Sequence, residues 1–284
     1  MIGVVPRHQE TRGARAPRLF FLREAWYCFV GQKGVLRMQW YTDWTEEFEK
    51  LGAFYRHDGI DLSKPFVRTR SGISDFYFNA DIVEEDPRVL SKAVGHLLGL
   101  PAFLRAMAHT PGALERTPRA QPPQTTMSPA PQAYVEDGQC FHVRVIAPAY
   151  GGILFSYEIG RHLGCKIAYT AKRADGTVGL RDGFVHRLDP EVPILLVDDT
   201  ITSGNTVRDT RDDVLRHVPH ARFVPCVLAL CNRSGSDELD GMQIASLISP
   251  RCRVWQDGRN PFTGGAERVS PVVKPKEHWR ELVG

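Results

Sequence analysis

The segment from Pro193 to Thr206 constrains this chain more than any other feature. It reads Pro-Ile-Leu-Leu-Val-Asp-Asp-Thr-Ile-Thr-Ser-Gly-Asn-Thr. Its apolar start predicts a strand covered on both faces. Two adjacent carboxylates follow, and a loop of small residues then opens a helical pattern. Backbone N–H groups at the start of a helix suit a phosphate, whereas carboxylates suit a sugar diol or Mg²⁺. The segment therefore predicts a ribose phosphate as ligand.

This pattern resembles the phosphoribosyl pyrophosphate (PRPP) signature of the type I phosphoribosyltransferases. The resemblance implies that Asp198 and Asp199 orient the ribose hydroxyls, directly or through Mg²⁺, and that the following loop holds the 5′-phosphate. The loop residues implied in PRPP binding are Thr200, Thr202, Ser203, Gly204, Asn205 and Thr206. Asn205 stands where Gly or Thr is more usual in the family. A plain strand–turn–helix with an N-capping hydroxyl is the structural alternative.

Two more segments are similar to those of orotate phosphoribosyltransferases. Residues 147–152 look like the pyrophosphate loop, which implies that Tyr150, Gly151 and Gly152 hold pyrophosphate. Residues 70–79 look like the base-binding segment, with Arg70 in place of the usual Lys and one residue missing after the glycine. There the resemblance implies that Arg70, Tyr77 and Phe78 lie beside the base. Without it, these segments are a glycine-rich turn and an aromatic strand.

Cations at two further places fit the same family. Arg208 matches an Arg that binds the carboxylate of the base, a task that suits the guanidinium fork. Residues 172–184 look like the short form of the family's mobile loop, which implies catalytic roles for Lys172, Arg173 and Arg181. The alternatives are a solvated Arg in a first helical turn and an exposed β-hairpin. The resemblance spans about residues 44–258.

The resemblance implies an enzyme that transfers ribose 5-phosphate from PRPP to N1 of orotate, giving orotidine 5′-phosphate and pyrophosphate. It also implies Mg²⁺ as cofactor and a homodimer in which the mobile loop reaches the neighbouring site. Two alternatives remain open at this stage. One is a phosphoribosyltransferase of the same fold for another base. The other is a non-catalytic PRPP-sensing regulator, for which the Arg-rich first 37 residues would be the added basic module.

Composition limits the other classes of function. A formal net charge of +3 over 284 residues gives no support for a nucleic-acid partner. No apolar run approaches the length needed to cross a membrane. The six cysteines include no C-x-x-C pair, so no zinc spacing is present. We expect a cytoplasmic protein, with an organellar transit peptide as the alternative for the basic N-terminus.

The expected fold class is α/β: the type I phosphoribosyltransferase fold, a parallel sheet flanked by helices with a small N-terminal hood. The expected regions are an N-terminal extension (1–40), the hood and first helices (41–108), a Pro-rich disordered insertion (109–134), the PRPP-binding core (135–258) and a tail (259–284). The expected core strands are 143–147, 166–170, 194–198, 222–230 and 252–255. The expected helices are 88–108, 152–163, 206–217 and roughly 241–248. Trp279 is a candidate anchor for the tail.

Overall fold

The computed structural model describes most of the chain, as two units. The described residues are 26–30, 36–40, 42–61, 63–69, 72–116, 139–173, 177–256 and 271–284. The first unit ends at Asp43, and the second begins at Trp44. In the first unit, strands β1 (Trp26–Val30) and β2 (Leu36–Trp40) pair antiparallel. The core of the Pro-rich insertion lies outside the described residues.

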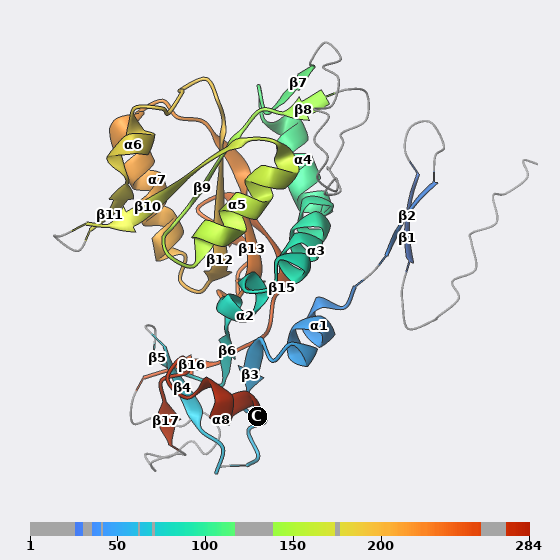
Figure 1. The fold of residues 1–284 in the computed structure, drawn as a ribbon, viewed down its shortest axis with the longest axis vertical. Coiled ribbons are helices and arrows are strands. Elements are labelled where there is room, and N and C mark those ends of the chain that lie inside the picture. Colours follow the sequence, from blue (N-terminus) through green and yellow to red (C-terminus); the bar gives the residue numbers. More distant parts are fainter. Residues whose placement is uncertain are drawn as a thin grey trace, which may run out of the picture. The chain divides into compact units, whose positions relative to one another are not determined.

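A seven-stranded sheet forms the centre of the second unit (Figure 1). Across the sheet, the strands are β11 (Val178–Leu180), β10 (Lys166–Lys172), β9 (Arg144–Ala147), β12 (Ile194–Ile201), β13 (Phe223–Asn232), β15 (Met242–Ile248) and β14 (Glu238–Leu239). The two edge strands β11 and β14 are antiparallel to their neighbours, and all other pairings are parallel. The carboxyl ends of β9 and β12 therefore lie at the same edge, where open α/β sheets bind ligands.

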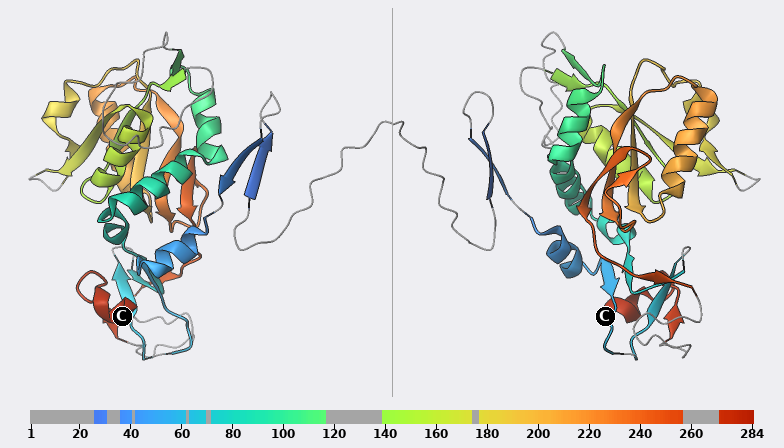
Figure 2. Two further views of the ribbon diagram at one scale, coloured as in Figure 1. Left: turned by 45° about the vertical axis from the view of Figure 1, so that its right-hand side comes forward. Right: turned by 180° about the vertical axis from the view of Figure 1, so that it is seen from behind.

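Helices cover both faces of this sheet, as the alternation in the sequence predicted (Figure 2). On one face pack α3 (Pro87–Leu98), α4 (Pro101–His109) and α5 (Gly152–Leu163). The other face is covered by α7 (Asn205–His217). Alternate residues of β12 serve the two cores, because Leu195 and Val197 lie in the first and Leu196 lies in the second. The predicted parallel α/β architecture is confirmed.

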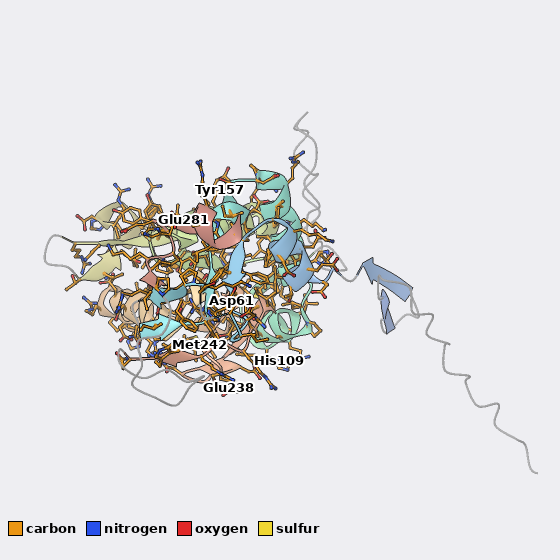
Figure 3. The ribbon with its side chains drawn as sticks, turned by 90° about the horizontal axis from the view of Figure 1, so that it is seen from below. Asp61, His109, Tyr157, Glu238, Met242 and Glu281 are labelled. Carbon is orange, nitrogen blue, oxygen red and sulfur yellow. The ribbon has the colours of Figure 1, made fainter. Side chains whose placement is uncertain are left out.

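A smaller β structure, called the hood here, lies at one end of the second unit (Figure 1). Its strands are β3 (Phe54–Arg56), β4 (Phe66–Thr69), β5 (Gly72–Ser74), β6 (Phe76–Phe78), β16 (Val254–Trp255) and β17 (Val272–Val273). The tail contributes β17, which pairs with β4, and the short helix α8 (Trp279–Val283). Figure 3 views this end, with Asp61 and Glu281 labelled as landmarks. The hood is thus completed by residues from both ends of the second unit.

Short elements connect these layers. They are α1 (Trp44–Lys50), α2 (Ala80–Glu84), β7 (Leu114–Arg116), β8 (Gln139–Phe141) and α6 (Asp182–Val185). Among the described residues, no helix combines the length and apolar character that a membrane crossing requires.

Three sequence predictions were wrong in detail. Residues 242–248 form strand β15 instead of a helix, because Asp240 and Gly241 adopt positive φ angles and turn the chain back beside β14. The helix predicted over 88–108 is two helices, because Pro101 has no N–H to continue the first and instead begins the second. The strand predicted at 252–255 belongs to the hood, where β16 pairs with β5.

Candidate functional site

Two adjacent carboxylates lie near the end of β12, in the middle of the sheet between β9 and β13. Asp198 is buried, and its Oδ2 accepts a 2.8 Å hydrogen bond from the hydroxyl of Thr206. Asp199 is partly exposed, and its Oδ1 accepts the N–H of Thr200 at 2.7 Å. Burial raises the pKa of both carboxyls, and the charge of Asp199 raises the pKa of Asp198 further. A cation or hydroxyl donors beside the pair would stabilise its ionised form.

The small-residue loop after β12 leads directly into α7. Gly204 adopts a φ of +75°, and a Cβ on it would lie 2.5 Å from Cδ1 of Leu239, so glycine is required twice over. The exposed Ser203 side chain accepts the N–H of Asn205 through Oγ at 3.4 Å. The hydrogen bond from Thr206 to Asp198 joins this loop to the acidic pair. The structure therefore brings the predicted phosphate loop and the predicted ribose-binding carboxylates together.

The loop between β9 and α5 approaches the same carboxylates. A Cβ on Gly151 would lie 2.4 Å from Oδ2 of Asp199, so the loop backbone passes directly beside that side chain. Gly152, the first residue of α5, is packed against Ala147, where a Cβ would lie 2.9 Å away. Tyr150 is 80% exposed, and its peptide bond to Ala149 is cis. Two segments far apart in the sequence, residues 149–152 and 198–206, thus meet at one edge of the sheet.

The predicted base-binding residues of the hood differ in their surroundings. Phe78 is 3% exposed and its ring lies 5.2 Å from that of Phe48, inside the main hydrophobic core. Tyr77 is only partly buried, and burial raises the pKa of its hydroxyl, with Asp199 among the charges that act on it. Arg70 lies outside the described residues. The Tyr77 ring lies 5.8 Å from that of Trp279 in the hood, and the charge of Asp199 is close enough to raise the pKa of its hydroxyl.

Arg208 lies on the first turn of α7, and its guanidinium is already engaged. Its Nε lies 3.1 Å from both carboxylate oxygens of Asp240. One Nη donates to the carbonyl of Ser203 at 2.7 Å and to Oδ1 of Asn205 at 3.1 Å. These bonds tie the phosphate loop to the turn after β14. A carboxylate ligand would have to compete with Asp240 for this guanidinium.

The three cations predicted on the mobile loop lie on or beside the β10–β11 hairpin. Lys172 ends β10 with an exposed side chain. Arg173 donates to the fully buried Asp213 of α7 at 3.2 Å. Arg181 donates to the hydroxyl of Tyr169 at 2.8 Å. Arg173 therefore joins the hairpin to α7, whereas Arg181 joins the end of β11 to β10 within the hairpin.

Arg233, at the end of β13, connects the sheet to the hood. Its guanidinium is buried, donates to the carbonyl of Phe76 at 2.8 Å, and lies 5.5 Å from the ring centroid of Phe76 and 6.0 Å from that of Tyr77. It also donates to the hydroxyl of Ser74 at 3.1 Å. Residues 229–235 resemble a strand end of the family, but the strand pattern gave no sign that this Arg contacts the ring of Tyr77.

The charged residues Asp81, Glu84 and Lys276 were missed at the sequence level. Lys276, in the turn before α8, donates to Oδ2 of Asp81 at 2.6 Å. The nearby Tyr77 and Asp199 contribute to raising its pKa. Glu84 is 9% exposed, and burial together with the charge of Asp199 raises its pKa to about 8. Only the tertiary fold brings the tail beside α2, so no local pattern could have found this group.

A parallel sheet with an acidic pair and a small-residue loop at the end of its central strand is the arrangement expected for the type I phosphoribosyltransferase fold. The particular relatives are orotate phosphoribosyltransferases. The protein of that name from Pelotomaculum thermopropionicum is 43% identical over 131 residues, which are 46% of this chain and 64% of that protein. The one from Erythrobacter litoralis is 34% identical over 131 residues, which are 46% and 63% of the two chains.

No family model matches the chain. The crystal structure of orotate phosphoribosyltransferase from Aeropyrum pernix aligns with a TM-score of 0.45 at 19% identity, covering 72% of this chain and 93% of that one. The chain spans about 64% of the length of the first curated relatives that it matches.

Proposed function

We propose that this protein is an orotate phosphoribosyltransferase, which transfers ribose 5-phosphate from PRPP to N1 of orotate and releases pyrophosphate. One observation carries the proposal. Thr206 bonds to Asp198 while Gly151 lies against Asp199, so the loops suited to the 5′-phosphate and to pyrophosphate flank one acidic pair. The similarity to enzymes of this name supports the choice of reaction.

The proposed reaction depends on positioning the substrates and stabilising charge, and it needs no covalent bond to the protein. As pyrophosphate leaves, positive charge grows on the anomeric carbon of the ribose, and negative charge grows on the leaving group. In our proposal Asp198 and Asp199 hold the ribose hydroxyls, the loop from Thr202 to Thr206 holds the 5′-phosphate, and the N-terminus of α5 faces the pyrophosphate. Lys172, Arg173 and Arg181 would then close over the leaving group and exclude water.

The acidic pair fits Mg²⁺ as cofactor. Both carboxyls have raised pKa values, so a cation beside them would favour their charged forms. Within the described residues, no three acidic, His or Cys side chains gather into a protein-only metal cage. Two carboxylates suit Mg²⁺, which usually completes its shell with water and substrate oxygens. Asp198 and Asp199 would hold it, directly or through water, and it would act as a Lewis acid toward pyrophosphate.

For the base, we propose a pocket between the hood and the acidic pair. Tyr77 offers the aromatic face, and the Arg233 guanidinium lies 6.0 Å from the centroid of its ring. The positive charge of Lys276 lowers the pKa of both Tyr77 and Asp199. Its ion pair with Asp81 is exposed, so it costs little to exchange that partner for a substrate carboxylate. Arg70 and Arg208 remain proposed partners of the same carboxylate.

A second candidate is a phosphoribosyltransferase for a base that lacks a carboxylate. The engagement of Arg208 by Asp240 favours it, because the proposed carboxylate reader already has an acidic partner. We also propose a homodimer and a cytoplasmic location, both of which rest on the family resemblance. Size-exclusion chromatography with light scattering tests the dimer.

A spectrophotometric screen of bases tests the proposed function. The full chain is mixed with PRPP, Mg²⁺ and, in turn, orotate, uracil, adenine and hypoxanthine. We expect a change in orotate absorbance that requires PRPP, with the other bases inert. Turnover of another base supports the second candidate, and no turnover of any base with intact protein contradicts both.

A further inference from the structure

A cavity of about 550 Å³ lies at the beginning of strands β9 and β10, and it has no part in the proposed reaction. Its lining residues are Arg144, Lys166, Ile167, Phe184 and Arg187. Arg144 and Lys166 begin their strands and are direct neighbours in the register of the sheet. The pyrophosphate loop follows the opposite end of β9. The cavity and the proposed active site therefore lie at opposite ends of the same strand.

The charge around this cavity is strongly positive. Three of its five lining residues are cations. The charge of Asp189 raises the pKa of one of them, Arg144. In the described part of the chain, neither Lys166 nor Arg187 forms an ion pair with an acidic side chain. Three like charges around one cavity repel each other unless an anion lies among them. The cavity is therefore electrostatically suited to an anionic ligand.

Arg144 carries a charge that is largely buried beside this cavity, which is a second observation besides the charge of the lining. The residue is 6% exposed, and its Nε is buried without a hydrogen-bond partner. A buried guanidinium normally has charged or polar partners, because an unsatisfied charged donor destabilises the fold. Burial also lowers the pKa of this group. An anion held by the outer nitrogens of the guanidinium would offset the cost of burying its charge.

We propose that this cavity binds a phosphate monoester with an apolar or aromatic body, of the size of a nucleoside monophosphate. Arg144, Lys166 and Arg187 would hold the phosphate, and Ile167 with Phe184 would contact the organic part. The volume lies in the usual range of small-molecule sites and far exceeds the space that a bare phosphate needs. This inference does not depend on the proposed function.

Isothermal titration calorimetry of the full chain with adenosine 5′-monophosphate and with inorganic phosphate tests the proposal. We expect the monophosphate to bind at least tenfold more tightly than phosphate. The variants K166M and R187M, both at exposed positions, should each weaken its binding at least tenfold. The matched control is R88M, which removes an exposed Arg paired with Asp86 on α3 and should bind as the wild type does. Circular dichroism of each variant verifies its fold.

The variant D199N separates this cavity from the proposed active site. We expect D199N to retain the binding that K166M and R187M lose. The proposal is overturned if the wild type binds neither probe, if K166M and R187M bind as tightly as R88M does, or if D199N alone abolishes binding. Equal affinity for phosphate and the monophosphate also overturns it, because the apolar wall then contributes nothing. Each of these results leaves the base screen, and so the proposed function, unaffected.

Discussion

The hydroxyl of Thr206 donates a 2.8 Å hydrogen bond to Oδ2 of Asp198, linking the first turn of α7 to the end of the central strand. Asp198 is 5% exposed, so this bond satisfies a carboxylate oxygen that has little access to water. The bond joins the two ends of the loop between these residues. In our account, this fixes the distance between the phosphate and the ribose hydroxyls of PRPP.

Replacing Thr206 by Val should therefore reduce both stability and binding. The substitution keeps the shape but leaves a buried carboxylate oxygen without its donor, which costs about 1–3 kcal/mol. We expect a lower free energy of unfolding in urea and weaker PRPP binding by calorimetry. Thr206→Ser keeps a hydroxyl and is the matched control. Equal stability of the Val variant and the wild type would show that the bond does not matter.

Gly151→Ala should damage the site without unfolding the protein. The added Cβ would lie 2.4 Å from Oδ2 of Asp199, so the loop or the carboxylate must move. A displacement of that size at a reacting centre is expected to cost about 100-fold in turnover. Gly95→Ala on α3 is the control, because its Cβ would meet nothing closer than Cε1 of His162 at 3.8 Å, an ordinary contact away from the site. Steady-state kinetics of the two variants measure the difference, and similar kcat values would contradict the proposed closeness.

Glu84 predicts how stability depends on pH. Burial raises its pKa from an ordinary 4.5 to about 8 in the folded protein. Between these values the folded state keeps a proton that the unfolded state releases, so the free energy of unfolding falls as pH rises, by at most about 1.4 kcal/mol per pH unit. Glu84→Gln should flatten this fall in urea titrations between pH 5 and 8. The exposed neighbour variant Glu85→Gln should retain the wild-type slope.

Arg208 and Lys276 can be separated by their effects on the two substrates. If each binds the carboxylate of the base, Arg208→Ala and Lys276→Met should each raise the KM for orotate about tenfold or more and leave the KM for PRPP unchanged. Lys274→Met, which removes an exposed Lys from the same tail, is the control. Equal increases in both KM values would show that these residues contribute to the overall positive charge of the site and do not bind the base.

The strands, helices and loops around the acidic pair could be predicted from the sequence because their signals are local. The strand 194–198, the helix 152–163 and the two loops between strands and helices follow from short apolar runs bounded by small residues. The β15 strand was mistaken for a helix because its position depends on the turn at Asp240. Lys276 and Arg233 reach the hood only through tertiary contacts, and no spacing in the sequence encodes those contacts.

The same limit applies to the cations around the hairpin. The family resemblance drew attention to Arg173 because of its charge and spacing. Its partner Asp213 lies 40 positions away on α7 and is fully buried. A solvated loop cation and a cation that fixes a hairpin look alike in a sequence, since only burial of the partner separates them.

Calorimetric binding of PRPP in the presence of Mg²⁺, without any base, tests the central claim most directly. The wild type should bind PRPP, and Asp199→Asn should bind it at least tenfold more weakly while keeping the same unfolding midpoint to within a few degrees. Equal affinities of the two proteins, or a wild type that does not bind PRPP, would contradict the claim that the acidic pair and the loop before α7 form one ribose-phosphate site.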